Sequence, residues 1–180
     1  MSTALNSGIT PEFAAAYRAV TCEGLQNEFE TTKKVLAAIP DAKRDYRPDP
    51  KARTAWDLAW HIASEDVLFL EQIAEGNFNF PDPRYDKARP GTVAELVAWY
   101  DKNFQRVLQR VRAMTPTQLV TPINFLGMFN LPGVFYLGFM NNHIIHHRGQ
   151  LATYLRPMGS KVPSIYGGSA DEPFQMPATA

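Results

Sequence analysis

The sequence predicts an all-α protein, with a single domain over residues 1–180 folded as a four-helix bundle. Four long segments repeat apolar residues with the helical period of about 3.6, and no segment shows the sustained alternation of an amphipathic strand. Apolar residues make up 45% of the chain and charged residues 20%, which is typical of a globular domain with a substantial core. Four amphipathic helices bury their apolar faces economically by packing against one another.

The first helix is expected over residues 11–39. The stretch TPEF places a threonine at the N-cap and a proline at the first helical position, and both residues are favoured there. A helical wheel gathers seven positions on the face expected to be buried: Phe13, Tyr17, Val20, Gly24, Thr31, Val35 and Ile39. A segment containing three prolines then ends the helix.

The second helix is expected over residues 54–75 and the third over residues 92–114. The third begins with TVAE, in which a threonine and the glutamate three residues later form a capping box. The connections after these two helices are longer than the ~2–8 residues usual in simple bundles. At least one crossover connection is therefore expected.

The fourth helix is expected over residues 132–157. The stretch NFLGMFNL before it is compatible with a short strand or hairpin, which the apolar pattern does not decide. The segment after it, SIYGGSADEPFQMPATA, is rich in glycine, proline and small residues. An irregular C-terminal tail is therefore expected.

Composition and charge argue against several classes of protein. Eighteen basic residues balance eighteen acidic ones without a basic run, which argues against nucleic acid as a partner. No apolar run reaches the ~20 residues that cross a bilayer, and the first ten residues lack the features of a signal peptide. A cytoplasmic protein is therefore expected. Its one cysteine, Cys22, is expected to be a small buried group and not a nucleophile.

Three of the four histidines lie in the stretch HIIHH of the fourth helix. On a helical wheel His143 and His147 fall within the apolar arc, whereas His146 falls outside it. His61 falls within the apolar arc of the second helix, and so does Glu65. Two imidazoles four positions apart have Cβ atoms ~5–6 Å apart, which suits two ligands of one metal ion. A histidine from a facing helix supplies a third ligand, as in metal sites of other helical bundles.

Metal binding by His61, His143 and His147 is the preferred interpretation. A single histidine on an apolar face is more often a hydrogen-bonded core residue, but two adjacent buried imidazoles need partners and should not both be charged. Three protein ligands leave one coordination position free, which is typical of reactive sites. The role of Glu65 stays open between a catalytic base, a fourth ligand or hydrogen-bond acceptor, and a solvated carboxylate. Glu28 also falls toward the predicted buried face, and it is a weaker candidate than Glu65 for a role at the site.

Two neighbours of the histidines have predicted roles. Arg148 is expected to anchor the structure and not to bind an anion. Gln150 falls beside the apolar arc of the fourth helix, so it is expected to touch the edge of the site.

Two motifs resemble the DinB-like family, also called the DinB/YfiT-like metalloenzymes. HIIHHRGQLATYLRPMGSKVPSIYGGSADE is similar to the C-terminal signature of that family, and WDLAWHIASED is similar to its histidine-bearing second helix. The resemblance covers nearly the whole chain and implies a four-helix bundle with a crossover connection, and a homodimer. It also implies a divalent metal held by three histidines, which map onto His61, His143 and His147. Gly168 stands where proline is expected, so the loop there lacks proline's fixed φ.

The resemblance leaves the reaction open. Some relatives resemble transferases or isomerases that use a low-molecular-weight thiol such as bacillithiol or mycothiol, and others resemble hydrolases. DNA damage-inducible expression gave the family its name and does not define its chemistry. We expect a metalloenzyme that activates a thiol or water, with Glu65 as the base. The alternative is a metal-binding stress-response or interaction protein without catalysis.

Three neutral imidazoles suit zinc or nickel as the first expectation, and iron, copper and cobalt are also compatible. The sequence does not specify the substrate. The balanced charge argues against a third interpretation, a damage protein that binds DNA.

Overall fold

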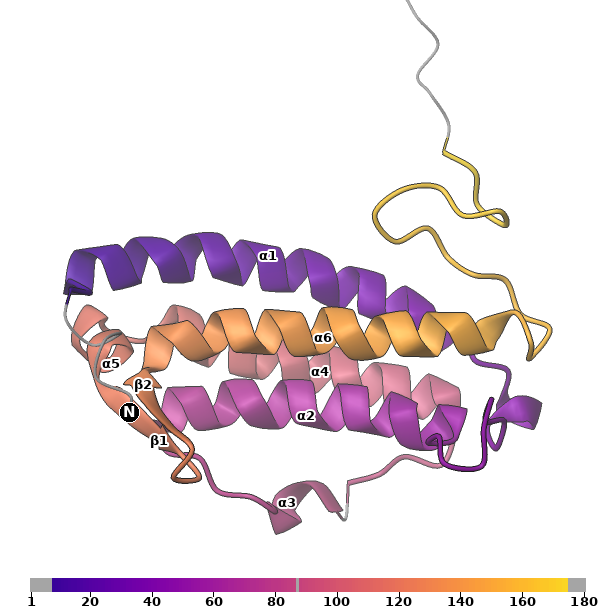
Figure 1. The fold of residues 1–180 in the computed structure, drawn as a ribbon, viewed down its shortest axis with the longest axis horizontal. Helices are drawn as coiled ribbons and strands as arrows, with labels where there is room; N and C mark the ends of the chain where they lie inside the picture. The colour runs from indigo at the N-terminus through magenta and orange to yellow at the C-terminus, as the bar shows by residue number, and fades with distance from the viewer. Residues whose placement is uncertain (1–7, 87, 175–180) are drawn as a thin grey trace, which may run out of the picture.

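The computed structural model describes residues 8–86 and 88–174, most of which are helical. Four long helices form its body (Figure 1): α1 (Pro11–Ala37), α2 (Ala55–Glu75), α4 (Val93–Arg112) and α6 (Gly133–Leu155). Short elements join them: the 3-10 turn η1 (Asp41–Lys43), α3 (Pro83–Asp86), α5 (Pro116–Val120), β1 (Pro122–Phe125) and β2 (Phe129–Pro132). The predicted helical fold class is confirmed. Among the described residues, no helix combines the length and apolarity needed to cross a membrane.

Local sequence sets where the long helices begin and end. Thr10, Thr54 and Thr92 cap α1, α2 and α4, and each side-chain oxygen accepts a hydrogen bond from a backbone N–H of the first turn. Glu95 completes the predicted capping box of α4. Helix α2 stops at Gly76, whose φ of 72° lies in the left-handed region that glycine adopts without strain.

The four long helices form a ring in which α1 and α2 each contact both α4 and α6. Helices α2 and α4 run in the same direction, whereas α2 and α6 run in opposite directions (Figure 1). Because α2 and α4 are parallel neighbours, the chain between them has to return along the length of the bundle. Residues 76–92, which include α3, make this return. The connection that follows the second helix thus returns along the bundle, which agrees with the expected crossover.

The buried face of α1 differs from the predicted one. Phe13 is 55% exposed and Val20 is 75% exposed, so the predicted face is wrong over the first half of the helix. The side chains that α1 buries are Ala14, Cys22, Leu25, Phe29, Thr32, Val35 and Leu36. Apolar residues lie on two sides of α1, and packing against α4 selects the side with Phe29, whose ring stacks on Phe104 at 4.4 Å between centroids.

The thiol of Cys22 belongs to this core, since the residue is 1% exposed. Burial raises the pKa of Cys22, so its thiol stays protonated at neutral pH. The expected structural role of this cysteine therefore agrees with its surroundings.

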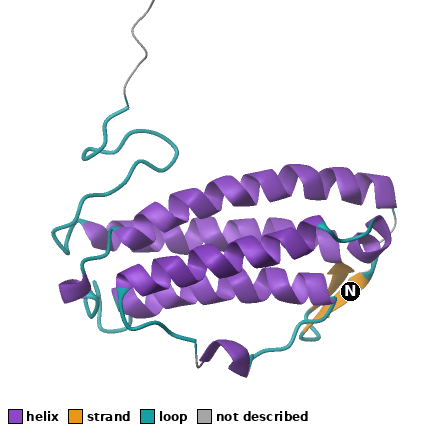
Figure 2. Cartoon of the chain, turned by 180° about the vertical axis from the view of Figure 1, so that it is seen from behind, coloured by secondary structure: helices purple, strands orange, loops and turns teal. Residues whose placement is uncertain are grey.

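The stretch NFLGMFNL contributes to an antiparallel hairpin beside the start of α6 (Figure 2). Strand β1 pairs with β2 from Pro122 opposite Pro132 to Phe125 opposite Phe129. The turn includes Gly127 with a φ of 76°, which glycine accepts readily. The C-terminal segment after α6 contains no helix or strand among its described residues, as predicted. Residues 175–180 of that tail and residues 1–7 lie outside the described residues.

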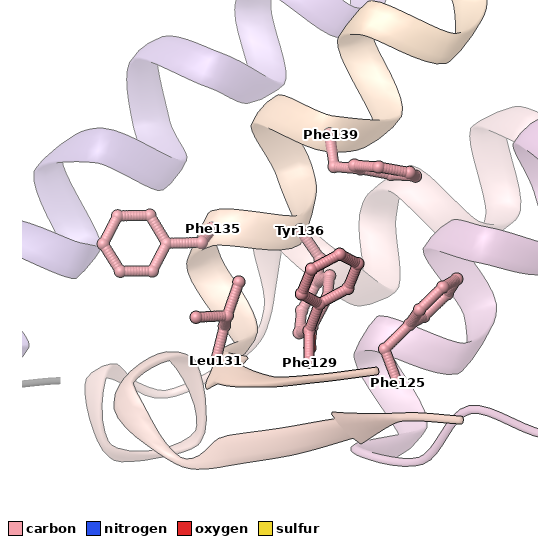
Figure 3. A pocket seen from close by; sticks show the side chains of 6 residues that line it. All are labelled: Phe125, Phe129, Leu131, Phe135, Tyr136 and Phe139. Atoms are coloured by element: carbon pink, nitrogen blue, oxygen red, sulfur yellow. The ribbon is translucent and has the colours of Figure 1, made fainter. Parts of the chain in front are cut away.

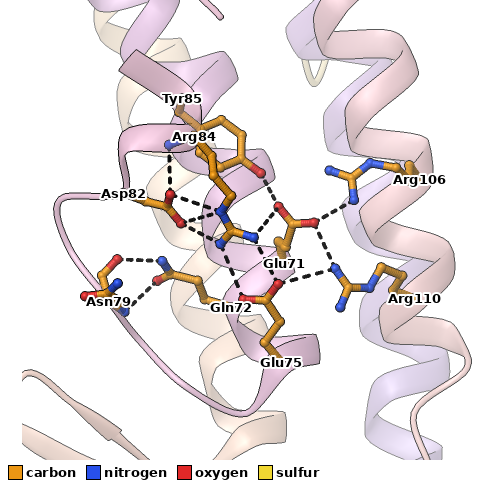
Figure 4. Close-up of polar contacts among 9 residues, drawn as sticks. All are labelled: Glu71, Gln72, Glu75, Asn79, Asp82, Arg84, Tyr85, Arg106 and Arg110. Carbon is orange, nitrogen blue, oxygen red and sulfur yellow. Dashed lines mark hydrogen bonds and ion pairs between the residues drawn. The ribbon is translucent and has the colours of Figure 1, made fainter. Parts of the chain in front are cut away.

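A network of hydrogen bonds and ion pairs links the crossover connection to α2 and α4 (Figure 4). Its centre is Glu71 on α2, which is only 5% exposed. The carboxylate of Glu71 accepts hydrogen bonds from Arg106 at 2.6 Å and Arg110 at 2.8 Å, both on α4. It also accepts the hydroxyl of Tyr85 on α3, and the guanidinium of Arg84 lies 3.8 Å away. One buried carboxylate thus joins three segments of the chain.

Replacing Glu71 by glutamine is expected to lower the free energy of unfolding at neutral pH by about 2 kcal/mol, because several hydrogen bonds lose their ionised acceptor. Burial alone would raise the pKa of Glu71. Hydrogen bonds from Arg106 and Tyr85, with the nearby positive charges, outweigh burial and place this pKa below its ordinary value of 4.5. The stabilisation is therefore present above about pH 4.5 and is lost as the pH falls through the lowered pKa.

Urea unfolding of the wild type and the Glu71→Gln variant at about pH 7 and about pH 3 measures this difference. The two proteins should differ in stability at neutral pH and converge in acid. A difference of equal size at both pH values would contradict the proposed role of the ionised carboxylate.

Candidate metal centre

His61 on α2 and His143 and His147 on α6 lie together at the seam between these antiparallel helices. One ring nitrogen from each lies within 4.8 Å of the other two. The ring of His147 is 4.5 Å from the rings of both His61 and His143, between centroids. The structure therefore brings the three predicted residues together. His146 is exposed, as predicted, and is not part of the group.

Oxygen atoms face the Nδ1 atoms of the two histidines on α6. The Nδ1 of His147 lies 2.8 Å from Oε1 of Gln150, and the Nδ1 of His143 lies 3.3 Å from Oδ1 of Asp66. An Nδ1–H that donates to an oxygen leaves the lone pair on Nε2. Gln150 thus touches the edge of the site, as predicted. The arrangement leaves the Nε2 atoms of both rings available as ligands.

The spacing between the histidines fits a shared metal ion. The Nε2 atoms of His61 and His147 are 3.2 Å apart. Two nitrogens bound to one tetrahedral ion at ~2.0–2.1 Å are about 3.3 Å apart. Without a metal ion, an Nε2–H of one ring donates to the Nε2 of the other at this distance, and a bound cation would take the place of that proton. The donor set, three imidazoles, also matches that of known catalytic zinc sites.

The surroundings keep two of the rings in the neutral form that metal binding requires. Burial, with the charges of Arg53, His143 and His147, lowers the pKa of His61 to about 3. Burial is also the main cause that lowers the pKa of His147, and neighbouring histidines add to it. Metal binding therefore does not have to compete with protonation of these two rings at neutral pH.

Asp66 is a functional candidate that the sequence reasoning missed. It is completely buried, with Oδ1 toward His143 and Oδ2 accepting the hydroxyl of Tyr100 at 2.7 Å. Burial raises the pKa of Asp66, and the hydrogen bonds from His143 and Tyr100 oppose that effect. The available signal was an acidic residue inside the apolar run of HIASEDVLFL, one position after Glu65. Such a carboxylate orients a ligating imidazole and strengthens it as a donor.

Replacing Asp66 by asparagine is expected to weaken metal binding about tenfold or more, because outer partners of ligating histidines typically contribute 10–100-fold. Asparagine keeps the shape and one acceptor oxygen, so the change isolates the negative charge. Competition for Zn²⁺ with a chromophoric chelator measures the affinity, and circular dichroism checks the fold. An unchanged Zn²⁺ affinity in a folded variant would show that Asp66 has no part in the site.

Glu65 lies at the open side of the site. Its Oε1 is 4.0 Å from Nδ1 of His61, and it lines a groove of about 470 Å³ together with His61. The group of potential ligands does not include Glu65. Burial raises the pKa of Glu65, and a carboxylate with a raised pKa is a better proton acceptor near neutral pH.

Glu28 lies apart from the three histidines and has a structural partner. Its carboxylate pairs with Arg148 of α6 and accepts the hydroxyl of Tyr166 at 2.9 Å. Arg148 is 1% exposed and also donates to Tyr166 at 2.7 Å. The predicted anchoring role of Arg148 agrees with these contacts, which join α1, α6 and the C-terminal segment.

An aromatic pocket adjoins the seam on the hairpin side (Figure 3). Its volume is about 170 Å³, and the residues that line it are Phe125, Phe129, Leu131, Phe135, Tyr136 and Phe139. Phe139 stands one turn before His143 and stacks on Phe69 at 5.4 Å between ring centroids. Phe69 stands one turn after Glu65 on α2. An apolar surface therefore begins one helical turn from His143 and two turns from His61.

Fold and site together define a helical protein whose second and last long helices carry a three-histidine group able to hold a metal ion. The chain belongs to the DinB family, whose family model matches residues 14–175. The family predicted from the two sequence motifs is thus confirmed.

Relatives and solved structures agree with this membership. The chain is 26% identical over 146 residues to the uncharacterized protein YrdA of Bacillus subtilis (strain 168), covering 81% of this chain and 85% of YrdA. It is 27% identical over 130 residues to the uncharacterized protein YjoA of the same organism, covering 71% of this chain and 82% of YjoA. A DinB-like protein from Bacillus cereus ATCC 10987 superposes with a TM-score of 0.69 at 25% identity, over 81% of this chain and 95% of that one. The structure of YjoA superposes with a TM-score of 0.64 at 22% identity, over 81% of this chain and 96% of YjoA, which supports the fold.

Proposed function

We propose that this protein is a divalent-metal-dependent enzyme that activates a thiol or a water molecule, in the manner of a thiol-dependent transferase or a hydrolase. The observation that carries the proposal is the convergence of His61, His143 and His147 on one point at a partly open seam. Three protein ligands, with Glu65 outside the group, match the pattern of reactive sites and not that of closed structural ones.

The protein's own residues have distinct parts in this proposal. His61, His143 and His147 hold the ion, which supplies Lewis acidity and lowers the pKa of a thiol or water. Glu65 receives the released proton at its carboxylate, since it lines the groove beside His61 and burial raises its pKa. Asp66 and Gln150 fix the orientation of His143 and His147.

Zinc and nickel are the proposed metals, and iron, copper and cobalt suit the same donors. A low-molecular-weight thiol is the proposed co-substrate of the transferase form of the reaction. The test is elemental analysis of protein made without a histidine tag, followed by a transferase screen with several thiols and a hydrolase screen with activated esters. We expect one metal ion per chain and turnover that stops on chelation. Metal-free protein that takes up no divalent ion would refute the proposal.

The alternative function is a metal-binding stress-response or interaction protein without turnover. It requires a fourth protein ligand or an otherwise closed site. Glu65 is the nearest candidate from the sequence analysis, at 4.0 Å from the ring of His61. Replacing Glu65 by glutamine separates the two functions. Lost turnover with normal metal content supports the enzyme, whereas lost metal content supports the closed site.

We also propose a homodimer, with the apolar outer face of α1 as its contact surface. Phe13 and Val20 are exposed there, and Phe13 stacks on Tyr17 at 6.2 Å between centroids. Burial of such side chains between two copies is favourable at roughly 25 cal/mol per Å². Light scattering after gel filtration should give twice the chain mass for the wild type and a single chain mass for Val20→Glu. A wild-type monomer would refute this assembly.

A further inference from the structure

The groove beside the three-histidine site contains a cationic side chain that the proposed chemistry does not use. This is Arg53, which stands immediately before the N-cap of α2 and is exposed. It lines the same groove as His61 and Glu65. Among the described residues, Arg53 forms no hydrogen bond through its side chain and no ion pair within 4 Å. The other arginine of this groove, Arg89, is paired with Asp57 at 2.8 Å.

The position of Arg53 is electrostatically unfavourable for a cation site alone. Its charge acts on His61, Glu65 and His147, so it stands within Coulomb range of the seam. A positive charge so placed repels a divalent ion held by the histidines. An anion that contacts both Arg53 and the metal ion is attracted by each of them, and it thereby offsets their mutual repulsion. The carboxylate of Glu65 in the same groove offsets part of the charge of Arg53, so an anion gains most where it contacts Arg53 directly.

The remaining groove wall contains both polar and apolar residues, and its carboxylates Asp57 and Asp82 are paired with Arg89 and Arg84. Leu68 and Phe80 supply apolar surface, and Trp60 adds an aromatic side chain. A volume of about 470 Å³ is within the range of small-molecule sites. The groove residues between Arg53 and His61 are Asp57 and Trp60, whereas Leu68 stands two helical turns beyond His61, so a ligand that joins Arg53 to His61 would pass Trp60.

We propose that the groove binds a small organic anion, with Arg53 holding its oxyanion group while the reacting end reaches the three-histidine site. This inference rests on the proposed function and adds a substrate class to it. Arg53 is a binding residue for the oxyanion, and its fork of N–H donors suits a carboxylate or phosphate. It does not take part in holding the metal.

The test uses two thiols that differ in charge, 3-mercaptopropionate and the neutral 2-mercaptoethanol. Titration of each into the Co²⁺-loaded full-length protein, followed by visible absorption, gives a dissociation constant without an activity assay. The wild type should bind 3-mercaptopropionate about tenfold more tightly, as expected for an added charge-assisted hydrogen bond. Arg53→Gln should lose this preference while binding 2-mercaptoethanol and Co²⁺ at least as tightly as the wild type. Arg53→Lys should keep part of the preference.

Lys51→Gln is the matched control, because Lys51 is exposed two positions away and does not line the groove. It should keep the full preference for the charged thiol. Equal preference in wild type and Arg53→Gln overturns the anion site and leaves the proposed function intact. Absence of the Co²⁺ bands in the wild type overturns the proposed function, and the anion site with it.

Discussion

Replacing His147 by alanine is expected to lower the affinity of the chain for Zn²⁺ roughly 100-fold or more, since even the loss of an outer partner of a ligand costs ~10–100-fold. His147 is the central member of the group, with both other rings 4.5 Å away between centroids. Without His147, only His61 and His143 remain as donors, and they lie on different helices. Two protein ligands are fewer than the three or four found in stable zinc sites. Competition with a chelator measures the affinity, and elemental analysis measures the metal content.

His146→Ala is the matched control for this experiment. His146 is the neighbouring residue on the same helix, has the same side chain and is exposed. The His146 variant should keep wild-type affinity, which separates ligand loss from a general effect of histidine removal. Full metal occupancy in the His147 variant would refute the assignment of the ligands.

Replacing Arg148 by methionine is expected to lower the free energy of unfolding by about 3–5 kcal/mol, the usual result of removing one partner from a buried ion pair. Arg148 is 1% exposed and pairs with Glu28, whose side chain is 14% exposed. Methionine preserves much of the volume but leaves the Glu28 carboxylate without its cation. The contact that holds Tyr166 is lost in the same variant.

Arg156→Met provides the comparison, because Arg156 is an exposed arginine at the end of the same helix and its partner is only half-buried. Its side chain is 59% exposed and pairs with Asp171 at 2.7 Å. Removing that pair should change stability by less than about 1 kcal/mol. Urea unfolding of both variants measures the contrast. Equal losses in the two variants would contradict the importance of burial for the Arg148 pair.

The histidine group was predictable because helix geometry restricts where its members point. Residues four apart on a helix share a face, so His143 and His147 had to lie side by side once α6 formed. His61 required only that α2 face α6. Asp66 was harder to find, because its role depends on how far α2 is rotated toward both His143 and Tyr100. Such rotation is a property of packing between helices and not of either helix alone.

The buried face of α1 could not be predicted from its own periodicity. Its first half offers Phe13 and Val20 on one side, and its second half offers Leu25 and Phe29 on another. Each set is compatible with a helical period, so the neighbouring helices decide which is buried. The crossover was predictable from linker length alone, but the parallel pairing of α2 with α4 was not.

The location of the histidines on the second and last long helices has a consequence for biosynthesis. During synthesis His61 leaves the ribosome before His143 and His147, which are more than 80 residues further along the chain. No N-terminal fragment that stops before α6 contains more than one of the three imidazoles. If the three imidazoles bind one ion, as proposed, that binding requires α6 to be synthesised and packed against α2.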